Sequence, residues 1–464
     1  MGEPVVVQGT VIAAPAVSYG GATETTTDRQ PAKTGCKDPI FAVLFYINVI
    51  AMFAVVGAYG VEAMDGVDAS NYTSYVAAAA VFGIVSMGAA LAGLFMLMTC
   101  PALIIKFGLI FSLAVALFFT VYAFFYLNFI YGIFALIFLL LTVCYVKAVW
   151  SRIPFAAINM LTAGTAIKAN LGVTFFALFF TVLEISWIIV WSVALVGVYD
   201  VTVVCDDADG TCDINYGYLF LLFLSLYFTQ QVLQSCVHVT VAGTVATWWV
   251  APDESGCCSK AVCNSFIRTV TTSFGSVCFG SLLVAIIQAL RSIANSARNN
   301  DDAAILACIA ECILGCIQSI VEYFNKWAYV YVGVYGFSYI EAGKAVMQLF
   351  KDRGWEAIIA DDLVGGAITL LSVVLGLIVG SVGVAYAAAD DNFANLAGNN
   401  SGAAFGIGFI AGFFVCLVLL STVSSGVNTV IVMFADAPQE FQTNHPELSM
   451  KMREKWGEFY PGSI

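Results

Sequence analysis

The residues from Ser273 to Arg291, SFGSVCFGSLLVAIIQALR, combine the length of a membrane span with a stripe of polar side chains. On a helix that turns about 100° per residue, one arc of about 120° carries four polar residues, a glycine and a valine. These are Ser273, Ser276, Gly280, Val284, Gln288 and Arg291. Because polar groups are costly against lipid, we expect this stripe to face protein or water. The segment therefore predicts one wall of a pathway through a membrane, with Ser281 and Gln288 as candidate substrate contacts.

Glu184 is the sharpest single candidate for binding a cation. It lies near the middle of an apolar segment, where an ionised side chain costs roughly 2.5–3.5 kcal/mol to insert. Thr181, Trp187 and Trp191 share its helical face. A carboxylate beside indole rings suits an organic cation, because each ring face attracts a quaternary ammonium by roughly 0.5–2 kcal/mol. The alternative is a protonated or paired Glu184, with tryptophans that pack or lie at an interface.

Other polar and aromatic residues are open to two interpretations. Tyr335 ends an aromatic run with Tyr329 and Tyr331, which either lines a cavity or forms an interfacial belt. The cluster of Gln230, Gln231, Gln234 and His238 favours hydrogen bonds between helices.

No group of residues indicates catalysis. The chain has two histidines and no glycine-rich phosphate loop. Cys308, Cys312 and Cys316 share a helical face, and that spacing favours close helix packing over a metal site. We therefore expect no enzymatic activity, no cofactor and no metal.

Composition places the chain in a membrane. Of its 464 residues, 61% are hydrophobic and 11% are charged, against about 25% charged residues in soluble domains. The net charge of −13 excludes a nucleic-acid-binding protein. We expect a disordered cytosolic tail over residues 1–38, a transmembrane domain over 39–436 and a cytosolic C-terminal tail over 437–464.

Apolar windows of about 20 residues predict an all-α polytopic protein with about ten transmembrane helices. The windows are Ile40–Tyr59, Tyr75–Met98, Phe107–Leu127, Ile130–Val149, Gly172–Gly197, Gly217–His238, Phe266–Ile293, Ala303–Gly336, Leu363–Ala388 and Phe405–Phe434. The sixth window can continue to Trp249. The eighth is too long for one straight crossing, and we expect either a break near Asn325–Lys326 or an added surface segment.

The distribution of Lys and Arg predicts that both termini are cytosolic. The loops Gly60–Ser74 and Asp200–Tyr216 then lie outside, and they contain acidic residues but no Lys or Arg. Two glycosylation sequons, at Asn71 and Asn399, fall on predicted outer loops, although such triplets also arise by chance. Cys205 and Cys212 flank an acidic turn on an outer loop, so we expect a disulfide between them.

Several of these segments, in this order, resemble the choline transporter-like family. The segment FGSVCFGSLLVAIIQALR is similar to the signature span of that family, and CKDPIFAVLFYINVI to its Asp-Pro start. The three spaced cysteines followed by EYFNKWAYVYVGVYGFSYIEAGKAV, then DDLVGGAITLLSVVLGLIVG and MFADAPQEFQTNHPEL, also resemble its later motifs. The resemblance covers roughly residues 36–450, and the yeast-type plasma-membrane branch is the most similar.

The resemblance implies about ten spans, cytosolic termini and transport of choline or a related small organic cation. It favours the plasma membrane, with an internal membrane as the alternative. The short first outer loop departs from the larger members, so no role tied to that loop is carried over. A channel, a lipid-handling protein and a trafficking scaffold without transport activity remain as alternative functions.

Overall fold

The fold consists of helices that gather into two compact units. The computed structural model of the chain describes residues 35–60, 69–198, 203–205, 212–257, 259–297, 304–354, 363–396 and 398–459. Ten helices among these residues are long and apolar enough to cross a membrane, which confirms the predicted all-α polytopic fold. The first unit joins residues 1–66 to 170–349, and the second joins 67–169 to 350–464. The predicted transmembrane domain thus has two parts.

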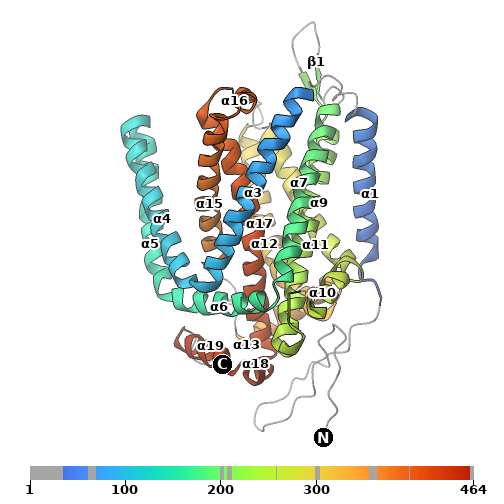
Figure 1. The fold of residues 1–464 in the computed structure, drawn as a ribbon, viewed down its shortest axis with the longest axis vertical. Coiled ribbons are helices and arrows are strands. Elements are labelled where there is room, and N and C mark those ends of the chain that lie inside the picture. Colours follow the sequence, from blue (N-terminus) through green and yellow to red (C-terminus); the bar gives the residue numbers. More distant parts are fainter. Residues whose placement is uncertain are drawn as a thin grey trace. The chain divides into compact units, whose positions relative to one another are not determined.

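The first unit contains every residue predicted to contact substrate. Its helices are α1 (Pro39–Val55) with a π-helical end η1 (Val56–Gly60), α7 (Gly172–Gly197), α9 (Tyr216–Val250), the short turn η4 (Pro252–Glu254), α10 (Lys260–Val270), α11 (Phe274–Ala297), α12 (Ala304–Tyr335) and most of α13 (Tyr339–Arg353). Helix α11 packs against α1, α9 and α12. Figure 1 shows α10 and the start of α11 at one end of this unit and the strands at its other end.

A two-stranded antiparallel hairpin precedes α9, and the sequence analysis did not predict it. Strand β1 (Val203–Cys205) pairs with β2 (Cys212–Ile214), and the register places Cys205 opposite Cys212. Directly opposite residues on such a ladder have Cα atoms about 4.5–5.5 Å apart. That spacing lies within the range of about 4.4–6.8 Å that a disulfide requires. The side chains of both cysteines lie outside the described residues, so the disulfide stays a prediction.

The second unit is built on three long helices. Its elements are α3 (Ala69–Thr99), α4 (Pro101–Tyr122) with η2 (Ala123–Leu127), α5 (Phe129–Val149), η3 (Trp150–Arg152), α6 (Ile153–Ala169), α15 (Leu363–Ala387), α16 (Asp391–Leu396), α17 (Ser401–Asp436), α18 (Pro438–Asn444) and α19 (Pro446–Phe459). Helices α15 and α17 pack along their lengths, and α3 lies against both. Gly383 and Gly408 make this close approach possible, because a Cβ atom on either would lie within 3.0 Å of a backbone oxygen on the facing helix. These glycines therefore form a close packing seam between α15 and α17.

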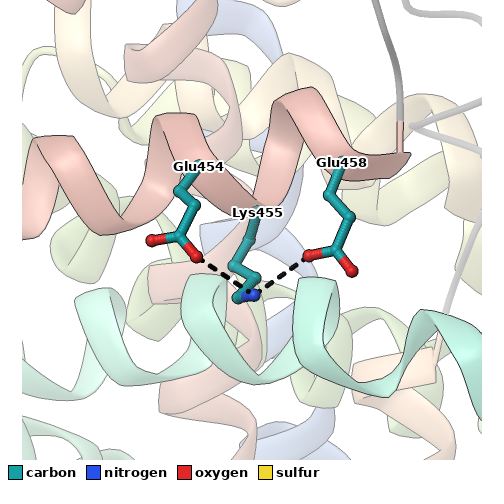
Figure 2. A network of polar contacts seen from close by, with 3 residues as sticks. All are labelled: Glu454, Lys455 and Glu458. Carbon is teal, nitrogen blue, oxygen red and sulfur yellow. Dashed lines mark hydrogen bonds and ion pairs between the residues drawn. The ribbon is translucent and has the colours of Figure 1, made fainter.

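The C-terminal helix α19 docks on α6 and α17 through one side. Trp456 is fully buried, donates to Asn159 Oδ1 at 3.1 Å and packs against the rings of Phe155 and Phe434. The other side of α19 is charged, and Lys455 lies between Glu454 and Glu458 at 3.4 and 2.9 Å (Figure 2). The predicted C-terminal tail therefore contains folded structure. Residues 1–34 of the predicted N-terminal tail lie outside the described residues.

Two features of the spans differ from the sequence-based expectation. Helix α12 runs unbroken through Asn325–Lys326, so the break expected there is wrong. Asn325 instead donates to Gly280 O on α11 at 3.0 Å, which stabilises the helix pair rather than ending the helix. At 1.5 Å per residue, the 32 residues of α12 span about 48 Å, more than the bilayer core of about 30 Å. The seventh span begins at Phe274 rather than Phe266, whereas α9 continues to Val250, in agreement with the expected extension of the sixth window to Trp249.

Candidate functional site

Glu184 is buried in the middle of α7. By the helical rise it lies about 18 Å from either end of the helix. Its side chain is 8% exposed, and among the described residues its Oε1 has no hydrogen-bond partner. An unpaired polar atom in an apolar interior is destabilising, so this oxygen is a candidate for contact with a ligand or water.

Trp187 lies one turn further along the same face of α7. Its indole packs in an apolar cluster with Met52, Ala194 and Leu222, and its ring centroid is 6.3 Å from that of Phe53. The Trp187 Nε1–H has no acceptor within the described part of the chain. Trp191, by contrast, donates to Leu222 O at 2.8 Å. Trp187 is therefore buried within reach of three helices, α1, α7 and α9.

A polar layer lies one helical turn from this apolar cluster. Helices α7 and α9 pack against each other, and one turn from the cluster each helix carries a buried polar residue. These residues are Glu184 on α7 and Ser225 on α9. Ser225 is 4% exposed, and its hydroxyl has no partner among the described residues. On α1 the corresponding residue is Asn48, whose Nδ2 donates to Thr229 Oγ1 at 3.1 Å.

The four residues Asn48, Glu184, Ser225 and Thr229 are called the Glu184 layer below. They supply one carboxylate, one amide and two hydroxyl groups from three helices. The layer can neutralise a positive charge while its hydroxyl and amide oxygens solvate the remainder of a small ligand. Sequence reasoning identified Glu184 but missed Ser225 and Thr229, although their spacing of four residues on an apolar span was a usable signal.

The stripe on α11 faces protein, as expected. Ser273, Ser276 and Val284 are buried, and Ser281 Oγ donates to Ser235 Oγ on α9 at 3.1 Å. Ser281 Oγ also lies 3.2 Å from Tyr329 Oη on α12. Further along the stripe, Gln231 Nε2 donates to Gln288 Oε1 at 3.4 Å. The glutamine cluster on α9 thus makes a hydrogen bond between helices, as predicted.

The predicted contact residues fall into separate groups within the first unit. Leu222, Ser225 and Thr229 share one face of α9, whereas Gln231 and Ser235 lie about half a turn away. Glu184 and Trp187 therefore lie on one side of α9, and Ser281 and Gln288 lie on the other. Tyr335 belongs to neither group. It packs with Tyr331 and Phe337, at ring distances of 5.0 and 5.8 Å, where α12 ends.

Titratable groups next to the stripe are tied to backbone or to other helices. His238 Nε2 lies 3.1 Å from Lys326 O. Tyr339, at the start of α13, donates its hydroxyl hydrogen to Asn325 Oδ1, and burial raises the pKa of this phenol above its ordinary value of 10.0. The described residues contain no group of three His, Cys, Asp or Glu side chains arranged to hold a metal ion.

The predicted glycosylation sites belong to the second unit. Asn399 is exposed, has a positive φ of 54° and lies between α16 and α17. Asn71 falls in the first turn of α3, and its side chain lies outside the described residues.

Comparison with known proteins gives the family. A sequence profile described as "Plasma-membrane choline transporter" matches residues 133–439, more than half of the chain. Protein PNS1 of Debaryomyces hansenii is 29% identical over 87% of this chain and 83% of its own length. Protein PNS1 of Gibberella zeae is 31% identical over 65% of this chain, which spans 58% of that protein. A CTL-like protein of Dictyostelium discoideum is 31% identical over 71% of this chain and 57% of its own length. The chain, whose described residues include ten apolar helices, therefore belongs to the choline transporter-like family of multi-pass membrane proteins.

Proposed function

We propose that this protein transports a small organic cation, choline or a close relative, across its membrane. Membership of the choline transporter-like family supports a transport function in general. The observation that carries the proposal for a cation is Glu184, a buried carboxyl group with a free oxygen in the centre of a membrane-spanning helix. An ionisable side chain inside a membrane span is costly, and such residues typically mark a path for a substrate or an ion.

The chemistry of the Glu184 layer suits a quaternary ammonium. Choline has no N–H group to donate, so its charge is best met by a carboxylate and by ring faces rather than by directed hydrogen bonds. Trp187 supplies an indole one turn from the carboxylate. The choline hydroxyl can pair with Ser225, whose oxygen is unpartnered among the described residues.

The membrane potential is a sufficient driving force for entry. An inward-negative potential contributes about 2.3 kcal/mol per positive charge per 100 mV. At 100 mV the concentration of the cation inside can therefore reach about fifty times the concentration outside at equilibrium. No second substrate needs to move with the cation for accumulation of that size.

The test is uptake of labelled choline into proteoliposomes that contain the purified chain, with a potential imposed by a potassium gradient. We expect saturable uptake that ethanolamine and other small cations inhibit and that collapses when the potential is removed. Steady current without saturation would instead indicate a channel. No uptake under any potential would reject transport and leave a scaffolding role.

A further inference from the structure

The segment that enters α1 is fastened to two other helices of the first unit by one carboxylate. Asp38 Oδ2 accepts a hydrogen bond from Ser276 Oγ on α11 at 2.7 Å. The same oxygen accepts from the backbone N–H of Tyr339 at 2.9 Å, at the first turn of α13. Residues far apart in the sequence therefore meet at Asp38. This junction lies at the end of the unit where α1, α11 and α13 begin.

The backbone at this junction is closely packed. Asp38 has a φ of 50° and a ψ of 44°, the left-handed conformation that non-glycine residues seldom adopt. Lys37 N donates to Thr272 O at 2.9 Å. Gly275 has no room for a side chain, because a Cβ atom there would clash with the carbonyl oxygens of Lys37 and Asp38. The conformation of Asp38 is thus fixed by contacts on both sides.

The hydrogen bonds continue from the junction to the polar stripe of α11. The Tyr339 hydroxyl donates to Asn325 Oδ1, and Asn325 Nδ2 donates to Gly280 O. The rings of Phe41 and Phe279 stack at 4.0 Å, and Cys278, the residue before Phe279 on α11, is 0% exposed. The described residues leave Cys278 no access to solvent at this end. The start of α11 is therefore buried at this end of the unit.

We propose that Asp38 is the positioning residue that closes one end of the transport pathway, by holding the starts of α1, α11 and α13 together. This closing role rests on the proposed function only because it assumes that the pathway beside α11 carries a substrate. The Lys and Arg distribution predicts that the closed end is cytosolic. Opening then requires Asp38 to release Ser276 and Tyr339, which lets α1 separate from α11 and uncovers Cys278.

Two substitutions at Asp38 distinguish the role of its side chain as an acceptor from the role of its backbone conformation. Glycine adopts the left-handed conformation without strain but offers no acceptor, so Asp38→Gly removes only the two hydrogen bonds. Asparagine also tolerates this conformation and keeps a carbonyl oxygen as acceptor, so Asp38→Asn is the matched control.

The measurement is labelling of Cys278 by a membrane-impermeant maleimide, quantified by peptide mass spectrometry in proteoliposomes with the reagent on either side. Losing two hydrogen bonds to a charged acceptor should raise labelling of Cys278 in Asp38→Gly by about tenfold or more, from one side only. We expect Asp38→Asn to stay within about twofold of the wild type. Ser276→Ala, which removes one of the two donors, should fall between them.

Cys416 controls for general loosening, because it is 0% exposed on α17 of the second unit. Unchanged labelling of Cys278 in Asp38→Gly would overturn the closing role. Parallel increases at Cys278 and Cys416 would also overturn it, because they would show loss of the fold rather than opening of one end. Labelling needs no substrate, so it tests the closure separately from the uptake assay that tests the proposed function.

Discussion

At the scale of single residues, the Glu184 layer and the Asp38 junction show two uses of a carboxylate. Asp38 accepts two hydrogen bonds and fixes structure. Glu184 Oε1 accepts none among the described residues, although its side chain is almost fully buried. A buried acceptor without a donor destabilises this state, which agrees with the proposal that Glu184 binds a cation.

Removing the charge at Glu184 should weaken cation transport without unfolding the protein. We expect Glu184→Gln to raise the KM for choline by about tenfold or more, a loss of about 1.4 kcal/mol or more. The thermal unfolding temperature should not fall, since the amide replaces an unpaired oxygen. The control is Ser186→Ala, on the same helix, whose exposed hydroxyl donates to Val182 O within α7. Equal KM values for Glu184→Gln and wild type would show that the carboxylate does not bind the substrate.

Tyr339 gives the junction a dependence on alkaline pH. Burial raises the pKa of its phenol above 10.0, so the folded state favours the protonated form. The corresponding stability is present below the pKa of the unfolded chain and is lost as pH rises through the higher pKa of the folded state. We expect the unfolding temperature of the wild type to fall above about pH 10. Tyr339→Phe, which cannot ionise, should be less stable at neutral pH and fall less steeply. Parallel pH profiles would contradict this role.

At the scale of elements, glycines set how closely the helices of each unit approach. A Cβ atom on Gly280 would lie within 3.0 Å of Tyr329, Tyr339 and Asn325. Three side chains from two elements therefore rest on the bare backbone of α11. The polar stripe therefore depends on this close approach. The side chains of Tyr329 and Tyr339 can lie against α11 only because Gly280 has no side chain.

Adding one methyl group at Gly280 should separate these elements. Overpacking typically costs about 1–3 kcal/mol, and we expect Gly280→Ala to lower the unfolding temperature accordingly. Gly88→Ala on α3 is the matched control, because nothing lies within 4 Å of a Cβ atom there. That change should stabilise the helix by about 0.5–1 kcal/mol. Thermal unfolding in detergent measures both, and a stable Gly280→Ala would mean that the aromatic residues repack freely.

Two neighbouring residues of α19 should differ in how much their substitution lowers the stability of the protein. Trp456→Ala removes a fully buried indole and should cost about 3–5 kcal/mol. Lys455→Gln breaks only the exposed ion pairs drawn in Figure 2 and should leave stability unchanged. Amide hydrogen exchange over α19 is the measurement, and it should rise in Trp456→Ala alone. Equal exchange in the two variants would show that α19 is not held by Trp456.

At the scale of the whole molecule, chemical modification of the predicted outer loops tests on which side of the membrane they lie. We expect Cys205 and Cys212 to form a disulfide and Asn399 to carry a glycan in a eukaryotic host. Mass spectrometry of non-reduced, glycosidase-treated peptides detects both at once. The matched variants are Cys212→Ser, which should free the thiol of Cys205, and Asn399→Gln, which should lose the glycan. Free thiols at both cysteines together with an unmodified Asn399 would argue that these loops face the cytosol.

The sequence predicted what depends on a single helix and missed what depends on pairs of helices. Hydropathy located the spans, and α7 matches its predicted window Gly172–Gly197 at both ends. The helical period correctly predicted that the polar stripe of α11 faces protein. The length of the eighth window suggested a break near Asn325, but Asn325 donates to Gly280 O on α11 and the helix runs on unbroken. Ser225 was missed because its burial depends on how α9 packs against its neighbouring helices.

The junction at Asp38 also bears on how the protein is made. Asp38 is separated from Ser276 by 238 residues and from Tyr339 by 301. At a synthesis rate of about 5–20 residues per second, roughly 12–48 s pass before a ribosome that has made Asp38 reaches Ser276. For most of this interval α1 has been synthesised while the helices that fasten it do not yet exist. Membrane insertion of α1 and its docking are therefore separate events in biogenesis, and the first helix must wait in the membrane for the last helices of its own unit.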